Sequence, residues 1–145
     1  MVSNGAYDLT AGYAWTRLVA APAGTSTAYA MFTIVVDSSN HYRIWESNGT
    51  IGFEKKINNV KSATTMTFDA VAHAFWRIRH DAASSNIVFE TAPSNGGLPG
   101  TWTTRRTVAR ELSVTAMRLE LKAGSTDPQS VSPGTVRFDD VRAAR

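Results

Sequence analysis

The fold is decided by a stretch that reads His73-Ala-Phe-Trp-Arg-Ile-Arg-His-Asp81, then Asn86-Ile-Val-Phe-Glu-Thr91, then Thr101-Trp-Thr-Thr-Arg-Arg106. Apolar and polar residues alternate within each of the three segments, which is the pattern of a β-strand with one buried and one solvated face. The breaks between the segments are short and contain Ser, Asn, Gly or Pro. Such breaks join neighbouring antiparallel strands.

Segments of this kind recur along the whole chain and predict about ten strands. The expected strands are Tyr13–Val19, Ala30–Asp37, His41–Ser47, Thr50–Ile57, Ala63–Phe68, Phe75–His80, Asn86–Thr91, Trp102–Val108, Thr115–Ala123 and Thr135–Arg142. This number of antiparallel strands in 145 residues fits an all-β fold, a two-sheet antiparallel β-sandwich of jelly-roll type. We expect a single domain, residues 1–145, with one helical turn near Val108–Leu112.

Three local features refine this expectation. Asn48-Gly49 between two alternating runs predicts a type I′ hairpin, because both turn residues need a positive φ. The nearly continuous apolar run Ala30–Asp37 is either a central strand covered on both faces or an alternating strand with Phe32, Ile34 and Val36 inside. Ala20–Thr27 and Gly124–Gly134 contain Gly and Pro and are expected to be loops.

Composition excludes several classes of protein. The net charge of +3 comes from 15 basic and 12 acidic residues spread along the chain, without the dense basic stripe typical of nucleic-acid binding. The absence of cysteine excludes disulfides and zinc–cysteine sites. No apolar run reaches the length of about 18 residues that would indicate a membrane span. The first residues do not form a secretory signal, so the chain is expected to be a domain excised from a larger protein.

Three features of the back half of the chain point to a known superfamily. They are Phe75–His80 followed by Asn86–Thr91, Trp102 after the turn Ser94–Gly97, and the ending Gly134-Thr-Val-Arg-Phe-Asp-Asp-Val141. Together, over about Tyr29–Val141, they resemble the concanavalin A-like lectin/glucanase superfamily and its laminin G-like members. The resemblance implies a carbohydrate-binding jelly roll with a glycan or polysaccharide as partner. It also implies a setting in a secreted enzyme or a phage tail or fibre protein, extracellular or on a virion surface.

Catalytic residues of the superfamily's enzymes have no clear counterpart. Those glycosidases space Glu, Asp and Glu along one strand, whereas the glutamates here stand apart, and only Glu46 and Glu54 could meet across a hairpin. Leu119–Gly124 resembles a strand of the sandwich polysaccharide lyases, but the Gln-x-His segment of those enzymes is missing. The three histidines are scattered and are expected at the surface or at strand edges. We therefore predict no catalytic residues.

A sugar site needs aromatic rings outside the core, flanked by side chains that form hydrogen bonds. Trp45 shares a face with Arg43, opposite Ile44, and is the strongest single candidate. The same alternation predicts that Trp76 lies in the core and that Tyr13 and Trp15 share a face with Arg17, while Trp102 lies either in the core or at the rim. The predicted ligand-binding residues are Trp45, Arg43, Arg77, Arg79, Arg118 and Glu120. An Arg-rich face would suit acidic glycans or be an ordinary charged strand face.

Asp139 and Asp140 are the candidate metal ligands. Adjacent carboxylates and loop carbonyls can bind calcium, and related carbohydrate-binding sandwiches hold a structural calcium near the closing strand. Alternatively, Asp140 accepts hydrogen bonds from the chain start or pairs with Arg137 or Arg142. No other cofactor is predicted.

Three functions remain open at this stage. The first is a non-catalytic, lectin-like glycan-binding module. The second is a structural or assembly domain that binds protein, with a homo-oligomer as one form. The third is a divergent glycoside hydrolase or polysaccharide lyase, which two carboxylates facing each other about 5–9.5 Å apart would favour.

Overall fold

The fold is taken from a computed structural model that describes residues 1–22, 27–126 and 135–145. Most of the predicted loop Gly124–Gly134 and half of the predicted loop Ala20–Thr27 lie outside these residues. The strand Arg118–Ser125 includes Gly124, so Gly124 belongs to a strand and not to the predicted loop.

The described part of the chain contains twelve strands. They are β1 (Tyr13–Ala20), β2 (Ala28–Asp37), β3 (Asn40–Ser47), β4 (Thr50–Ile57), β5 (Val60–Thr67), β6 (Phe75–Asp81), β7 (Asn86–Ala92), β8 (Ser94–Asn95), β9 (Leu98–Pro99), β10 (Thr103–Ala109), β11 (Arg118–Ser125) and β12 (Arg137–Ala144). All ten predicted strands are present, and β8 and β9 form an additional short hairpin. The described residues contain no helix, and therefore none with the length and apolar character needed to cross a membrane. The helical turn predicted at Val108–Leu112 is wrong, because β10 continues to Ala109 through its pairing with β7.

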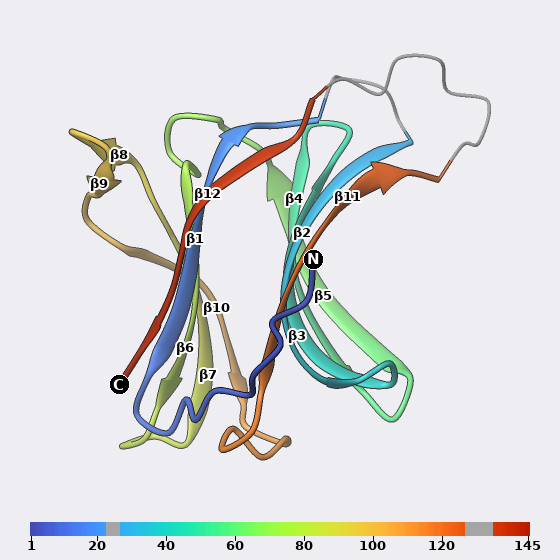
Figure 1. The fold of residues 1–145 in the computed structure, drawn as a ribbon, viewed down its shortest axis with the longest axis vertical. Helices are drawn as coiled ribbons and strands as arrows, with labels where there is room; N and C mark the ends of the chain where they lie inside the picture. Colours follow the sequence, from blue (N-terminus) through green and yellow to red (C-terminus); the bar gives the residue numbers. More distant parts are fainter. Residues whose placement is uncertain (23–26, 127–134) are drawn as a thin grey trace.

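Ten of the strands form two five-stranded antiparallel sheets that face each other as two layers (Figure 1). The β6 sheet has the order β10-β7-β6-β1-β12, and the β3 sheet has the order β11-β2-β3-β4-β5. The predicted all-β jelly-roll sandwich is confirmed. Sequential strands β2 to β5 are neighbours, whereas β1 lies between β6 and β12, so distant parts of the chain meet in the β6 sheet.

The tight turns follow the sequence pattern. Asn48 and Gly49 have φ values of 52° and 70°, which confirms the predicted hairpin between β3 and β4. A second turn of this kind joins β4 to β5 through Asn58 and Asn59, with φ values of 49° and 67°. Asparagine tolerates this left-handed region better than other non-glycine residues. The two turns fix the pairing of β3, β4 and β5 residue by residue.

The core lies between the layers and is built from the inward side chains of both sheets. Phe89 of β7 packs edge-on against Tyr42 of β3 and Phe53 of β4, with ring centroids 6.4 and 6.3 Å apart. Trp76 is fully buried, as predicted, and its indole Nε1 donates to the carbonyl oxygen of His73 at 2.9 Å. Phe32 and Ile34 point inward as expected, but Val36 is 47% exposed because the pairing of β2 with β3 is irregular between Val35 and Asp37.

The first residues of the chain cover the edge of β11. Ser3 donates its backbone N–H to Leu119, and Tyr7 and Met117 exchange two backbone hydrogen bonds. The segment therefore protects backbone groups of β11 that would otherwise lie open at the edge of the β3 sheet.

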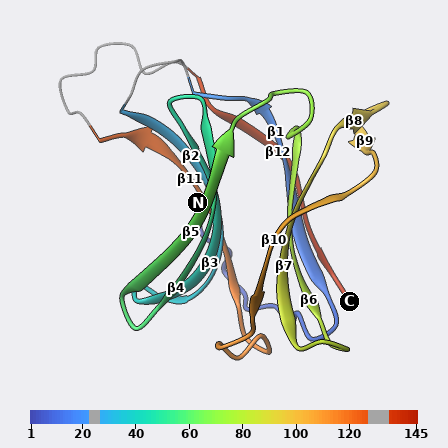
Figure 2. The same ribbon diagram turned by 180° about the vertical axis from the view of Figure 1, so that it is seen from behind.

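On the opposite side of the sandwich, Arg106 links the two sheets at their edges. Its guanidinium, on β10, donates to the carbonyl oxygens of Phe53 and Ser62, both at 2.6 Å, and to the Ser62 hydroxyl. Figure 2 shows this side, with β10 and β5 at the edges of the two layers.

Arg106→Met is expected to lower the free energy of unfolding by about 1.5–3 kcal/mol, because hydrogen bonds from a charged group are lost and a carbonyl loses its partner. Urea denaturation measures this loss. Arg105→Met is the matched control, since among the described residues Arg105 donates a side-chain bond only to the Thr91 hydroxyl. Equal losses in the two variants would show that Arg106 does not tie the sheets together.

All three histidines are buried, which corrects the expectation of surface or edge positions. The ring Nδ1 of His73 accepts the backbone N–H of Asp69 at 3.0 Å, and the ring Nδ1 of His80 accepts that of Ala11 at 3.1 Å. The rings act as local caps for backbone N–H groups, a role that carries no periodic signal in the sequence. Burial, and then the nearby charges of Arg105 and Arg110, lower the pKa of His73 and His80 respectively below 6.5.

These two histidines are expected to make the fold less stable in mild acid. Because their folded pKa values lie below the ordinary value of 6.5, the unfolded chain takes up more protons as the pH falls through 6.5. The melting temperature should therefore drop between about pH 7.5 and about pH 5.5. In the variant His73→Asn, His80→Asn, amide oxygens can replace Nδ1 as acceptors, and the drop should be smaller. An unchanged drop in this variant would contradict the assignment.

Candidate functional site

The outer face of the β3 sheet gathers polar and aromatic side chains from four of its strands. The strand registers place them in rows that cross β4, β3, β2 and β11. The three rows are Gly52, Trp45, Met31, Lys122; then Glu54, Arg43, Thr33, Glu120; then Lys56, His41, Val35, Arg118. We call the side chains of these rows the platform.

The platform lies on a concave surface. In Figure 1 the upper ends of β2 and β11 and the lower ends of β3 and β4 all bend to the right, away from the β6 sheet. The backbone of the β3 sheet therefore curves so that its outer face is concave, and we call this concave face the trough. Because side chains alternate along each strand, one set fills the core and the other set points into this concave face.

Trp45 lies flat on the sheet at one side of the platform. Its register partner on β4 is Gly52, and a β-carbon at Gly52 would lie 2.2 Å from Cε2 of the indole and 2.3 Å from Cζ2. Only glycine leaves room for the ring at this place. One face of the half-buried indole therefore rests on the backbone of β4, and the other is free for a flat apolar surface.

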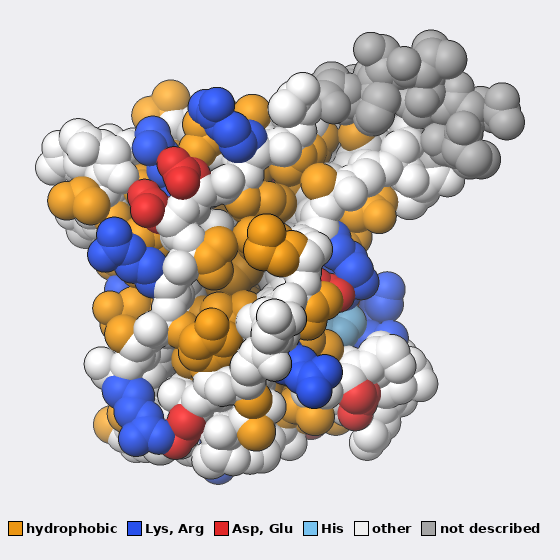
Figure 3. All heavy atoms as spheres, in the orientation of Figure 1, with side chains coloured by type: hydrophobic (Ala, Val, Ile, Leu, Met, Phe, Trp, Pro, Cys, Tyr) orange, Lys and Arg blue, Asp and Glu red, His pale blue; other side chains and the backbone are white. Residues whose placement is uncertain are grey.

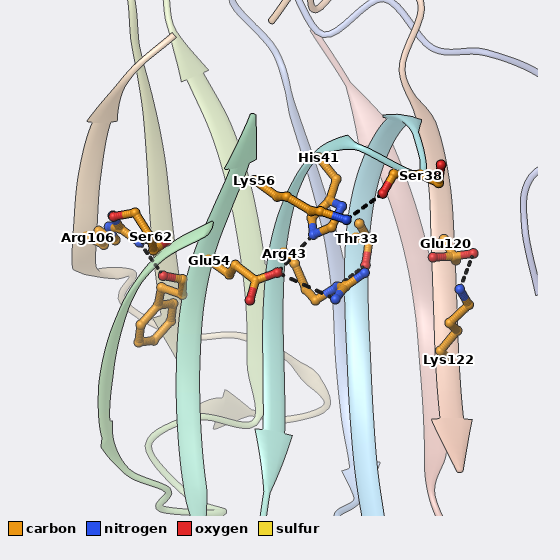
Figure 4. A network of polar contacts seen from close by, with 11 residues as sticks. Thr33, Ser38, His41, Arg43, Glu54, Lys56, Ser62, Arg106, Glu120 and Lys122 are labelled. Carbon is orange, nitrogen blue, oxygen red and sulfur yellow. Dashed lines mark hydrogen bonds and ion pairs between the residues drawn. The ribbon is translucent and has the colours of Figure 1, made fainter. Parts of the chain in front are cut away.

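A hydrogen-bonded network holds the middle of the platform (Figure 4). The carboxylate of Glu54 is 2.9 Å from Nε2 of His41 and 3.5 Å from Nη1 of Arg43, and Nε of Arg43 donates to the Thr33 hydroxyl at 3.1 Å. Burial alone would raise the pKa of Glu54, but the hydrogen bond with His41 and the charge of Arg43 outweigh it and hold that pKa below its ordinary value. The network fixes Arg43 in one orientation.

Beside this network the surface is hollowed into a polar pocket of about 310 Å³. Its lining includes His41 and Arg43 of β3 and Arg118, Glu120 and Lys122 of β11. The volume is at the lower end of the range of about 300–1,000 Å³ typical of ligand pockets. The concave face thus offers a flat ring and an adjacent polar hollow.

Four of the six predicted ligand-binding residues lie together on this platform. They are Trp45, Arg43, Arg118 and Glu120. The expectation that Arg77 and Arg79 join them is wrong, because β6 belongs to the other sheet. Their ligand role stays a prediction, but they cannot share one surface with Trp45.

Arg77 and Arg79 lie on the outer face of the β6 sheet. Arg77 donates to Glu90 at 2.6 Å, and its guanidinium stacks 4.1 Å from the ring centroid of Trp102. Trp15 lies on this face together with Tyr13 and Arg17, with which it was predicted to share a face, and packs edge-on against the buried Phe75. Trp102 is half-buried beside this small outer cluster, so it lies at a rim and not in the main core.

The two carboxylates in the rows of the platform do not form a hydrolytic pair. Glu46 and Glu54, which the sequence allowed to meet across the hairpin, do not do so, because Glu46 points inward beside Ile44 while Glu54 points outward. On the platform, Glu54 and Glu120 stand three strands apart, about 14 Å at the usual strand spacing. That separation exceeds the range of about 5–9.5 Å used by glycosidases.

The metal prediction receives no further support from the described residues. No group of three or more His, Cys, Asp or Glu side chains that could hold a metal ion occurs among residues 1–22, 27–126 and 135–145. Asp139 accepts the backbone N–H of Asp140 at 3.0 Å, and Asp140 lies 4.0 Å from Arg142, as the alternative interpretation expected. A calcium ion would have to take most of its oxygens from backbone and water.

The residues that were missed are His41, Glu54 and Gly52. The signal for them is present in the sequence, because a two-residue turn at Asn48-Gly49 places Arg43 opposite Glu54 and Trp45 opposite Gly52. Their grouping follows from the register of this hairpin and from no recognisable motif.

Comparison with known proteins defines the class of fold. The chain matches no family model and no curated protein sequence. Sheep galectin-11, solved in complex with glycerol, superposes with a TM-score of 0.61 and 8% identity, covering 99% of this chain and 96% of the galectin. Bacillus licheniformis β-glucanase superposes with a TM-score of 0.56 and 15% identity, covering 98% of this chain and 65% of the enzyme. A functionally unknown protein from Saccharomyces cerevisiae gives a TM-score of 0.59 at 15% identity, covering 99% of this chain and 71% of that protein.

The protein therefore has the concanavalin A-like jelly-roll fold that the sequence resemblance predicted. At these identities the likeness establishes the fold alone. The two named neighbours also differ in class, since one is a galectin and the other a glucanase. The function has to be argued from the platform itself.

Proposed function

We propose that the protein is a non-catalytic glycan-binding module whose sugar-binding surface is the platform on the concave face of the β3 sheet. The observation that carries this proposal is the Trp45 indole lying flat over Gly52 beside the fixed Arg43 and the polar pocket. Sugars present apolar C–H faces between hydroxyl groups, so they need both an aromatic plane and directed hydrogen-bond partners. The platform offers both within two residues of β3.

Glu54 and Glu120, the two carboxylates in the rows of the platform, stand too far apart to act as a glycosidase pair, which supports binding over hydrolysis. The carboxylate of Glu54 is occupied by His41 and Arg43, and Glu120 is paired with Lys122 at 3.0 Å. The setting in a secreted enzyme or a phage protein stays a prediction.

A glycan array with the purified protein tests the proposal. We expect binding to at least one class of glycan, and competition by the same glycan free in solution. An array on which neither the protein nor a multivalent form of it binds any glycan would overturn the proposal. The multivalent form is needed because single sites of this size bind sugars weakly.

A second candidate function, self-assembly without sugar, is favoured by a different surface. An apolar groove of about 360 Å³ lies between the N-terminal segment, β11 and β12, lined by Tyr7, Leu121 and Val141 among others. Figure 3 shows hydrophobic side chains gathered between the two layers on this side. Light scattering distinguishes the candidates: a monomer at all concentrations would exclude self-assembly, while a stable oligomer that binds no glycan would favour it.

A further inference from the structure

The inference concerns the charge of the ligand and rests on the proposed function. On the platform, most acidic acceptors are already engaged within the protein, whereas cationic donors remain available to a ligand. Glu54 binds His41 and Arg43, and Glu120 binds Lys122. Asp37, at the end of the pocket, accepts hydrogen bonds from Ser39 and Asn40.

The cationic groups, in contrast, retain unused donors. The Nε of Arg43 donates to Thr33 and its Nη1 pairs with Glu54. These two contacts hold the guanidinium in position and leave Nη2 as an unused donor. Lys122 has three donors and one acidic partner. Within the described part of the chain, the exposed guanidinium of Arg118 has neither an ion pair nor a hydrogen bond.

These three cations surround one pocket. Arg118 and Lys122 come from alternate positions of β11, and Arg43 comes from β3, with β2 between them. Figure 4 shows Arg43 and Lys122 on the two sides of the strand that carries Thr33. A ligand oxygen in this pocket would therefore meet N–H donors from both sides.

An acceptor-rich, negatively charged group fits such a pocket better than a neutral hydroxyl. A guanidinium binds a carboxylate or a sulfate through two parallel hydrogen bonds, and these charge-assisted bonds are shorter and stronger than neutral ones. Trp45 lies two residues along β3 from Arg43, about 7 Å at the rise of a strand. That spacing places a ring on Trp45 and an acidic substituent in the pocket.

We propose that the glycan bound by this protein is anionic, with a carboxylate or sulfate seated among Arg43, Arg118 and Lys122 and a neutral sugar face stacked on Trp45. Arg118 supplies the free guanidinium, and the network of Glu54 holds Arg43 in place. The cationic side chains thus recognise the anion, and the indole of Trp45 recognises the sugar ring.

The test uses sets of glycans on the array that share a backbone and differ in charge. Uronic acid oligosaccharides are compared with their methyl esters, and sulfated oligosaccharides with their desulfated forms. We expect the charged member of a pair to bind at least about tenfold more tightly, and its binding to weaken as salt is raised from about 0.1 M to about 1 M. The two sets separate a carboxylate from a sulfate ligand.

Arg118→Gln is the decisive variant and Arg142→Gln its matched control. Both remove one exposed guanidinium, but Arg142 lies on the β6 sheet. Arg118→Gln should weaken binding of the charged glycan about tenfold or more and leave the melting temperature unchanged, while Arg142→Gln should leave binding unchanged. Lys122→Gln removes a second cation from the lining of the pocket and provides a second readout.

The outcomes separate this inference from the proposed function. Equal binding of neutral and charged members, with no effect of Arg118→Gln, would overturn the anionic ligand but leave the glycan-binding module standing. Loss of binding in Arg142→Gln and not in Arg118→Gln would move the anion site to the β6 sheet and overturn the inference. Failure to bind any glycan would remove the proposed function and this inference with it.

Discussion

Trp76→Ala is expected to lower the free energy of unfolding by about 3–5 kcal/mol, the largest stability effect of any single substitution considered for this fold. The Trp76 side chain is 0% exposed and packs edge-on against Phe138 of β12, two strands away in the same sheet, with ring centroids 6.0 Å apart. Truncation removes the apolar contact area, leaves a cavity and deprives the His73 carbonyl of its donor. Because small domains are stable by about 5–15 kcal/mol, the loss amounts to about a fifth or more of the total stability.

Urea denaturation followed by far-ultraviolet circular dichroism measures this loss. The control is Trp102→Ala, which removes a ring of the same size from a half-buried site at the rim of the outer cluster. It should cost clearly less, because surrounding side chains and water can fill the site. If the two variants were equally stable, Trp76 would not be a central core residue and the assignment of inner and outer faces on β6 would be wrong.

Trp45→Ala is expected to have the largest effect on glycan binding, a loss of about 30-fold or more. A fall of about 2 kcal/mol is typical when an aromatic residue at the centre of a binding surface is truncated, and 1.4 kcal/mol corresponds to a factor of ten. The effect on stability should stay near 1 kcal/mol or below, because one face of the ring already lies in solvent. Titration calorimetry with a glycan identified on the array gives the affinity.

Gly52→Ala separates the position of the ring from its presence. The added β-carbon would overlap the indole, so the ring has to leave the sheet while Trp45 itself remains. We expect a loss of affinity close to that of Trp45→Ala, with the strand register intact. The control is Ser47→Ala, which changes the same face of β3 away from the pocket. Wild-type affinity in Gly52→Ala would show that the flat orientation of the indole is not required.

The sequence predicted the strands well because the alternation of apolar and polar residues is a local signal. The inward set of β3 and β4 and the burial of Trp76 follow from it directly. The turn at Asn48-Gly49 also carries the register of β3 against β4, from which the facing pairs Arg43–Glu54 and Trp45–Gly52 can be calculated. This part of the platform was predictable, although the pairing of Glu54 with Arg43 and His41 was not drawn from it.

The partition of strands between the sheets was not predictable in the same way. Arg77 and Arg79 have the alternation expected of an outer face, but nothing local states which sheet β6 joins. Its pairing with β1 joins residues about sixty positions apart, and such contacts depend on the packing of the whole domain. The burial of His80 was missed for a related reason, since its ring accepts the backbone N–H of Ala11, which only the folded chain brings to it.

The most direct test of the glycan-binding surface uses the four tryptophan indole N–H signals in a nitrogen–proton correlation spectrum. Each face of the molecule has its own reporter: Trp45 on the platform, Trp76 in the core, and Trp15 and Trp102 on the outer side of the β6 sheet. Titration with a glycan bound on the array should shift the Trp45 signal strongly and leave the other three in place. A shift of Trp15 or Trp102 with an unmoved Trp45 would place the site on the opposite sheet and contradict the proposal.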